Sequence, residues 1–343
     1  MSFDQFLPDY GILPSKYFER SVISNPIELF WSDDVLALLR LCGAKEEMIG
    51  GRASDYDRFL SLCRALPLLE EHPTRAWIAS LLDQYFGVRE LPTEENAQAV
   101  WKMLCEHLWE FPIAPKDLVI GSWLCDTLTV PSALPQNLIP VLSGNLLLNT
   151  TSKKAIEWSA EIDTTVAQFA KKGCKKIVVQ LQKNFEFALP SLYGVDRALS
   201  LAKRDCEAIN LLTCQLVREL CVAAQKHDLL LVLDCCAHPN ALVNLLEYAE
   251  ESVGLPRICW STREVREANA LLDFSAKPHK SEMLAALPYE CVMTQNELSL
   301  AIESWQMRYP VGRMCFITAR DLRQTPYAQA HIQNMLEKGK TKI

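Results

Sequence analysis

Residues 229–238 read Leu-Leu-Leu-Val-Leu-Asp-Cys-Cys-Ala-His, and this stretch decides the predicted fold. A run of consecutive apolar residues is typical of a strand that is buried on both faces of a parallel sheet. The run ends abruptly in an aspartate, two cysteines and a histidine, which would lie at the carboxyl end of that strand. Parallel strands are joined by helices, so the stretch favours an α/β fold.

The same alternation extends through the carboxyl-terminal two thirds of the chain. Short apolar runs predict strands at 118–124, 175–181, 229–233 and 313–317, and weaker patterns predict strands at 138–142, 257–260, 271–275 and 289–293. Helical patterns lie between them at 155–171, 204–226, 240–252 and 296–307. No G-x-G-x-x-G motif and no P-loop follows a strand, so we predict a (β/α)8 TIM-type barrel, complete or incomplete, rather than an open nucleotide-binding sheet.

Residues 32–111 show a different pattern, with helix signals and little strand character. Ser54 and Thr93 are suited to N-cap positions, and Pro73 fits the first turn of a helix. Gly43 and Gly87 stand where two apolar helical stripes stop. The aromatic and leucine stripes on these helices indicate packing rather than a cofactor site.

These patterns divide the chain into three parts. Residues 1–31 contain a short predicted first strand of the barrel, near Leu7–Pro14. Residues 32–111 form a predicted helical insertion after that strand, and residues 112–343 form the remainder of the barrel.

Composition excludes several classes of function. The formal net charge is −7, and no basic stripe with interleaved aromatic residues is present, so we expect no nucleic-acid partner. No apolar run is long enough to span a membrane, and the first ten residues lack the apolar core of a signal peptide. A cytoplasmic protein without a membrane partner is therefore expected.

The chain has 13 cysteines, but none of them forms a C-x-x-C pair. Most lie singly inside apolar runs, as Cys42, Cys63, Cys105 and Cys221 do. This distribution predicts reduced, buried thiols rather than a disulfide framework.

The helical part carries a resemblance to a known family. Residues 39–44, Leu-Arg-Leu-Cys-Gly-Ala, and residues 49–59, Ile-Gly-Gly-Arg-Ala-Ser-Asp-Tyr-Asp-Arg-Phe, are followed by Trp77, by Tyr-Phe-Gly-Val at 85–88 and by Trp101. These landmarks resemble, in the same order, those of the uronate (glucuronate) isomerase family of the amidohydrolase superfamily. The resemblance implies a barrel with a helical insertion. It also implies aldose–ketose isomerisation of D-glucuronate to D-fructuronate, with a divalent metal such as zinc.

The metal-binding motifs of that family are changed in this sequence. Its D-Y-H-x-H-L motif corresponds to Asp-Tyr-Gly-Ile-Leu at 9–13, and its Y-H-W-T-H motif to Arg-Ala-Trp-Ile-Ala at 75–79. Its T-D-S-R motif corresponds to Thr-Ala-Arg-Asp at 318–321, where Ala319 replaces the metal-binding aspartate. The six histidines include no H-x-H pair and no zinc spacing. We therefore predict no cofactor and no metal.

Four residues remain as candidate catalytic residues: Asp126, Asp234, His238 and Arg320. Asp126 retains one carboxylate of the family's T-D-D-P motif, although a carboxylate at this position is more often a helix cap or a hydrogen-bonded loop residue than a base. Asp234 and His238 flank Cys235 and Cys236, so a soft-metal or thiol site is one interpretation, and capping of the helix that begins at Pro239 is the other. Arg320 follows the last predicted strand, where an ion pair with Asp321 is the alternative.

Two functional hypotheses follow from these observations. The first is a uronate isomerase-like protein with a degenerate active site. The second is a catalytically inactive paralogue that binds a sugar acid or a protein partner. The partners expected from these hypotheses are a small-molecule sugar acid and further copies of the chain in a homo-oligomer.

Overall fold

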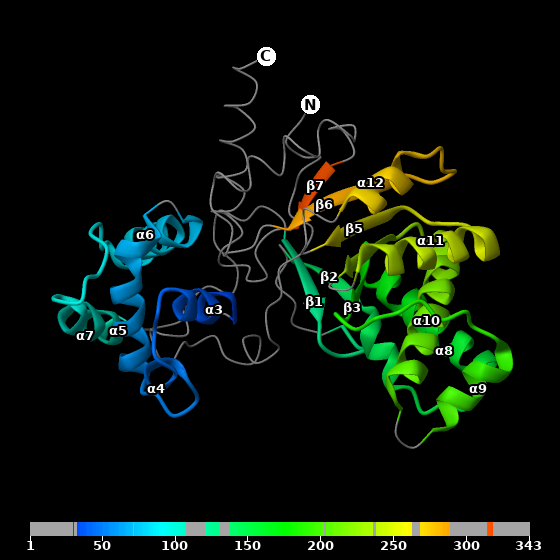
Figure 1. Cartoon of the computed structure of the whole chain (residues 1–343), viewed down its shortest axis with the longest axis horizontal. Coiled ribbons are helices and arrows are strands. Elements are labelled where there is room, and N and C mark those ends of the chain that lie inside the picture. The colour runs from blue at the N-terminus through cyan, green and yellow to red at the C-terminus, as the bar shows by residue number, and fades with distance from the viewer. Residues whose placement is uncertain are drawn as a thin grey trace, which may run out of the picture. The chain divides into compact units, whose positions relative to one another are not determined.

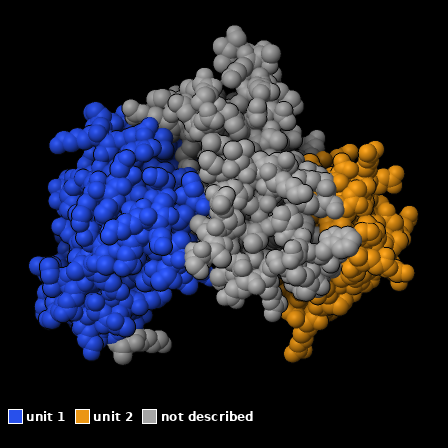
Figure 2. Space-filling model, turned by 180° about the vertical axis from the view of Figure 1, so that it is seen from behind, with its two compact units in different colours: residues 1–15, 119–288, 301–317 blue, residues 16–118, 289–300, 318–343 orange. Residues whose placement is uncertain are grey.

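The computed structural model describes residues 30, 33–70, 72–107, 121–130, 138–201, 204–235, 238–262, 268–288 and 314–317 (Figure 1). The chain divides into two compact units. The sheet unit comprises residues 1–15, 119–288 and 301–317, and the helical unit comprises residues 16–118, 289–300 and 318–343 (Figure 2). The predicted first strand and the predicted boundaries at 31/32 and 111/112 lie outside the described residues, so they stay predictions.

The described part of the helical unit consists of helices. They are α3 (Asp33–Leu41), α4 (Glu46–Ile49), α5 (Asp55–Ala65), the 3-10 helix η2 (Leu66–Leu69), α6 (Pro73–Phe86) and α7 (Ala97–Glu106). The predicted stops are confirmed, because Gly43 and Gly87 follow α3 and α6 with φ of 86° and 67°. A left-handed backbone of this kind favours glycine and ends a helix.

Thr93 was predicted to cap a helix, and this prediction is wrong. Helix α7 begins at Ala97, after an N-cap at Asn96. Thr93 instead forms a turn with Asn96, in which each side chain accepts a hydrogen bond from the other residue's backbone N–H. This local alternative satisfies the polar groups that a cap would have used.

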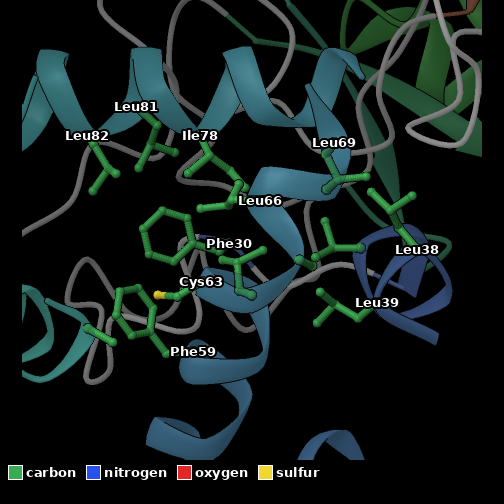
Figure 3. Packing of buried hydrophobic residues seen from close by; sticks show 14 of the residues in the cluster. Phe30, Leu38, Leu39, Phe59, Cys63, Leu66, Leu69, Ile78, Leu81 and Leu82 are labelled. Carbon is green, nitrogen blue, oxygen red and sulfur yellow. The ribbon is translucent and has the colours of Figure 1, made fainter. Parts of the chain in front are cut away.

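The helical unit has its own core, shown in Figure 3. Phe59 is fully buried, and its ring centroid lies 6.0 Å from that of Phe30 and 5.2 Å from that of Trp101. Leu39, Cys63 and Leu82 extend the same cluster from α3, α5 and α6. The aromatic stripe of the sequence is therefore a packing feature.

The sheet unit contains seven described strands, all parallel, in the spatial order β1 to β7 (Figure 1). The strands are β1 (Gly121–Cys125), β2 (Leu138–Ser143), β3 (Lys176–Leu181), β4 (Leu230–Cys235), β5 (Ile258–Thr262), β6 (Met283–Pro288) and β7 (Met314–Ile317). Spatial order that follows chain order is the arrangement of a (β/α) barrel. A doubly wound sheet reverses its order at a switch point.

Helices connect these strands. They are the 3-10 helix η3 (Gly144–Asn149), α8 (Ala155–Lys171), α9 (Leu192–Ser200), α10 (Cys206–His227), α11 (Pro239–Val253) and α12 (Asn269–Ala276). Helix α8 has the predicted bounds, and α10 and α11 lie within two residues of theirs. None of the described helices is both long and apolar enough to cross a membrane.

One strand prediction is wrong, because residues 271–275 lie inside α12. Leu271, Leu272 and Phe274 are buried on one helical face, and so short an apolar run fits either period. Strand β6 was not predicted, since its alanines have low strand propensity. The predicted strand at 289–293 and the predicted helix at 296–307 lie outside the described residues.

Side chains from six strands form an apolar cluster on one face of the sheet. Its buried members include Val141, Val178, Val232, Cys259 and Ala286. Because side chains alternate along a strand, the residue two positions further on each strand lies on the same face. This alternation places polar residues near the carboxyl ends of three strands on the same face as the cluster.

Candidate functional site

Three polar residues lie side by side at the carboxyl ends of β3, β4 and β5. Gln180 is in register with Asp234, and Asp234 is in register with Ser261. Each follows a member of the buried apolar cluster by two positions, so all three lie on the cluster's face of the sheet. Barrel active sites are built at the carboxyl ends of the strands. We call Gln180, Asp234, Ser261 and Asn145, which is described below, the polar layer.

Asp234 is the centre of the polar layer. The buried Ser261 donates a hydrogen bond from Oγ to Asp234 Oδ1 at 2.9 Å. Gln180 Nε2 lies 3.5 Å from Asp234 Oδ2, which is long for a hydrogen bond. Asp234 is half-buried and Gln180 is exposed. One carboxylate oxygen is therefore fixed, while the other retains acceptor capacity towards solvent.

Asn145 holds the neighbouring edge of the polar layer. Its Nδ2 donates to the backbone oxygen of Gln180 at 2.9 Å, and the Gln180 backbone N–H donates to its Oδ1 at 2.7 Å. Strand β2 ends at Ser143, and the Asn145 side chain then makes the hydrogen bonds to the backbone of β3 that the next residue of a paired strand would make. Gly144 makes the turn between Ser143 and Asn145 possible, because a Cβ there would lie 2.8 Å from Val179 Cγ2.

His238 lies at the start of α11 and acts as its N-cap. Its Nδ1 accepts a hydrogen bond from the backbone N–H of Asn240 at 3.3 Å, and Pro239 takes the first helical position. The capping interpretation is therefore confirmed. The side chain of Cys235 and residues 236–237 lie outside the description, so a thiol or soft-metal site there stays untested.

Asp126 is exposed and follows the last residue of β1, Cys125. Burial raises the pKa of the Cys125 thiol to about 12, so this thiol stays protonated at neutral pH. Asp126 is thus placed at the carboxyl edge of the sheet, where a catalytic role for it stays a prediction. Arg320 lies outside the described residues.

The polar layer does not fit the divalent metal that the family resemblance implies. It offers one carboxylate, two carboxamides and one hydroxyl, whereas zinc prefers imidazole and thiolate ligands. Among the residues that the structure describes, no three His, Cys, Asp or Glu side chains converge as a metal site. We therefore derive no catalytic step through a metal.

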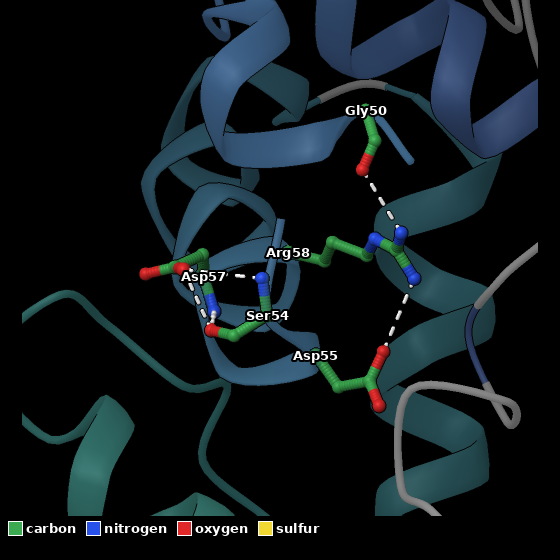
Figure 4. Close-up of polar contacts among 5 residues, drawn as sticks. All are labelled: Gly50, Ser54, Asp55, Asp57 and Arg58. Atoms are coloured by element: carbon green, nitrogen blue, oxygen red, sulfur yellow. Dashed lines mark hydrogen bonds and ion pairs between the residues drawn. The ribbon is translucent and has the colours of Figure 1, made fainter. Parts of the chain in front are cut away.

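The family landmark at residues 49–59 has a structural role in the described contacts, shown in Figure 4. Ser54 caps α5, and with Asp57 it forms a capping box of reciprocal hydrogen bonds. Arg58 donates to the backbone oxygen of Gly50 at 2.9 Å and pairs with Asp55 at 3.1 Å. These contacts shape the start of the helix.

Sequence reasoning missed three members of the polar layer: Asn145, Gln180 and Ser261. The signal available was a polar residue at the end of an apolar strand, as in Ile-Val-Val-Gln at 177–180. Neutral side chains carry no strong functional pattern by themselves, and their grouping depends on strand register. Asp234 was found because a carboxylate after a buried strand is unusual.

The strand order and the carboxyl-edge polar layer together define a protein of the (β/α)-barrel class. Two solved structures confirm this fold. Uronate isomerase from Thermotoga maritima is similar over 98% of this chain and 91% of its own, with a TM-score of 0.70 at 15% identity. Glucuronate isomerase from Caulobacter crescentus is similar over 98% of this chain and 88% of its own, with a TM-score of 0.74 at 12% identity.

Sequence comparison finds similarity to the uronate isomerases. Residues 18–125 match the family model for glucuronate isomerase. A uronate isomerase of Streptococcus uberis is 34% identical over 123 residues, which is 35% of this chain and 26% of that protein. A uronate isomerase of Streptococcus pneumoniae is 26% identical over 297 residues, which is 76% of this chain and 64% of that protein. The resemblance seen in the sequence is therefore confirmed, and this chain spans 26% and 64% of the length of these two uronate isomerases in the matched regions.

Proposed function

We propose that this chain is a uronate isomerase-like protein with a degenerate active site, which binds a sugar acid without isomerising it. The observation that carries the proposal is that the His238 side chain caps helix α11. His238 is the one described imidazole that follows the carboxyl end of a strand, and its Nδ1 already accepts the Asn240 N–H as a helix cap. An imidazole used in this way does not present that nitrogen to a metal or a substrate.

The chemistry of the family reaction supports the same proposal. Aldose–ketose isomerisation needs a base for the C2 proton and a positively charged or strongly donating group for the enediolate oxygen. Asp234 supplies a carboxylate, but its nearest donors are the neutral Ser261 hydroxyl and Gln180 amide. Within the described residues, the polar layer therefore supplies a proton acceptor and only neutral hydrogen-bond donors.

The test is an isomerase assay on the whole chain. Purified protein is incubated with D-glucuronate, with and without added zinc or manganese, and D-fructuronate is measured. The Streptococcus pneumoniae uronate isomerase serves as the active control. We expect no product above the protein-free background, together with calorimetric binding of D-glucuronate. Metal-dependent formation of D-fructuronate would contradict the proposal.

A second candidate function, binding of a protein partner, has its own supporting observation. Leu189, Leu192 and Tyr193, in and just before α9, are 69%, 76% and 80% exposed. Three large apolar side chains so close in sequence are a feature of interaction surfaces. The partner that we propose is a second copy of the chain, in a cytoplasmic homo-oligomer. Sedimentation of the wild type and of Tyr193→Ser tests this, because loss of the contact would shift the oligomer towards monomer.

A further inference from the structure

We infer that the polar layer recognises sugar hydroxyl groups and leaves the sugar carboxylate to another part of the protein. This inference rests on the proposed sugar-binding function and adds the chemical group that the polar layer takes. The groups that the layer offers to a ligand are the amide, hydroxyl and carboxylate of Gln180, Ser261 and Asp234, whereas the Asn145 carboxamide binds the Gln180 backbone.

Asp234 provides the acceptor for a sugar hydroxyl. Ser261 fixes Oδ1 at 2.9 Å, and this holds the carboxylate plane in one orientation. Oδ2 faces the Gln180 amide at the long distance of 3.5 Å. A sugar hydroxyl can donate to Oδ2 while the Gln180 amide donates to the same hydroxyl oxygen or to its neighbour. Charge-assisted hydrogen bonds of this kind are stronger than neutral ones.

The charge of the polar layer argues against the sugar carboxylate as its ligand. None of the four side chains is cationic, and Asp234 is an acid. A ligand carboxylate at Oδ2 would place two carboxylate groups, neither of which offers a donor, against each other. Hydroxyl groups meet no such repulsion, because each one both donates and accepts.

Asn145 is a positioning residue for this subsite. Its two hydrogen bonds to the Gln180 backbone, at 2.9 and 2.7 Å, fix the end of β3 beside Asp234. The Gln180 side chain is thereby held on the face that carries the carboxylate. Loss of the Asn145 carboxamide would release this strand end without removing any group that touches the sugar.

The experiment compares D-glucuronate with D-glucose, which keeps the ring hydroxyls and replaces the carboxylate by a hydroxymethyl group. Binding of both sugars is measured by calorimetry for the wild type, Asp234→Asn, Gln180→Ala and the control Glu251→Gln. Glu251 is an exposed carboxylate on α11, outside the polar layer. Since hydrogen bonds to charged groups are worth more than neutral ones, we expect Asp234→Asn to weaken both sugars about tenfold.

Gln180→Ala should weaken both sugars in the same direction, and because Gln180 is exposed this variant tests the inference even where Asp234→Asn fails to fold. Glu251→Gln should leave both affinities within about twofold, as a surface change does. Unchanged D-glucose binding in Gln180→Ala and Asp234→Asn would overturn the inference, and so would stronger D-glucuronate binding in Asp234→Asn. Neither of these results bears on turnover, whereas formation of D-fructuronate would overturn the proposed function and leave the hydroxyl subsite standing.

Discussion

The helical unit and the sheet unit differ in what their sequences have retained. The family match at residues 18–125 falls mostly in the helical unit, where its landmark residues cap helices and fill a core. The sheet unit keeps the strand order of the barrel and carries the polar layer at its carboxyl edge. The sequence similarity in the helical unit thus reflects common ancestry and helix packing, whereas the candidate ligand-binding residues lie in the sheet unit.

The largest expected effect lies in the core of the helical unit. Phe59→Ala removes a fully buried ring that contacts Phe30 and Trp101. We expect a loss of about 3–5 kcal/mol in the free energy of unfolding, from lost burial and the cavity left behind. Denaturant unfolding measures it. Leu41→Ala is the control, because Leu41 is 77% exposed, and an equal loss in both variants would refute the core assignment.

The next effect lies in the sheet unit, at Gly144. A Cβ there would meet Val179 Cγ2 at 2.8 Å and Leu220 Cδ1 at 3.0 Å, so Gly144→Ala overpacks the turn that places Asn145. We expect about 1–3 kcal/mol of destabilisation and weaker binding of D-glucuronate. Gly51→Ala in the helical unit is the control, since its Cβ would meet nothing within 4 Å. Normal stability and binding in Gly144→Ala would show that the turn tolerates a side chain.

Buried thiols make both units sensitive to alkaline pH. Burial raises the pKa of Cys63 in the helical unit and of Cys125 in the sheet unit to about 12. The unfolded thiol ionises near pH 8.5, so the stabilisation is complete below that pH and is lost as the pH rises towards the folded value. Each thiol should lower the free energy of unfolding by about 1.4 kcal/mol per pH unit above pH 9.

Denaturant unfolding between pH 8 and 10.5 measures this slope. Cys63→Ala removes one buried thiol and should therefore make the slope of the free energy of unfolding against pH shallower. This change in slope is expected even if the variant is less stable at every pH. The control is Leu41→Ala, which changes an exposed side chain without a titrating group and should leave the slope unchanged. A slope equal in all three proteins would contradict the burial of Cys63.

The smallest expected effect compares one helix cap in each unit. Ser54 in the helical unit belongs to a capping box, whereas Ser191 in the sheet unit caps α9 by accepting only the Gly194 N–H. Alanine at either position should cost about 1 kcal/mol, and Ser54→Ala should cost more because the Asp57 contact is also lost. Thermal unfolding of the two variants ranks them. A larger loss of stability in Ser191→Ala would contradict the expectation that the capping box at Ser54 stabilises more than the single cap at Ser191.

Periodicity and caps predicted most of the described fold. The continuous apolar runs at 175–181 and 229–233 correspond to β3 and β4, and the caps at Ser54 and Gly87 lie where the sequence placed them. The failures came from ambiguous stretches. Residues 271–275 are too short for the helical and strand periods to be separated.

The prediction of reduced, buried thiols is confirmed for some of the described cysteines and wrong for one of them. The described cysteines are free, and Cys63 and Cys221 are buried as expected, but Cys105 is exposed. An apolar neighbourhood in sequence does not fix the face on which a helical residue lies. The polar layer was only partly predictable, because the register that joins Gln180 to Asp234 exists in the sheet and not in the local sequence.

The most direct test of the central claim is solvent exchange of the C2 proton of D-glucuronate. Isomerisation through an enediol removes this proton, so deuterium enters C2 in heavy water even when little product accumulates. Proton NMR of D-glucuronate with the whole chain and added zinc or manganese should show exchange no faster than in the protein-free control. Protein-dependent deuterium incorporation at C2 would contradict the account and establish that this relative still performs the first step of the family reaction.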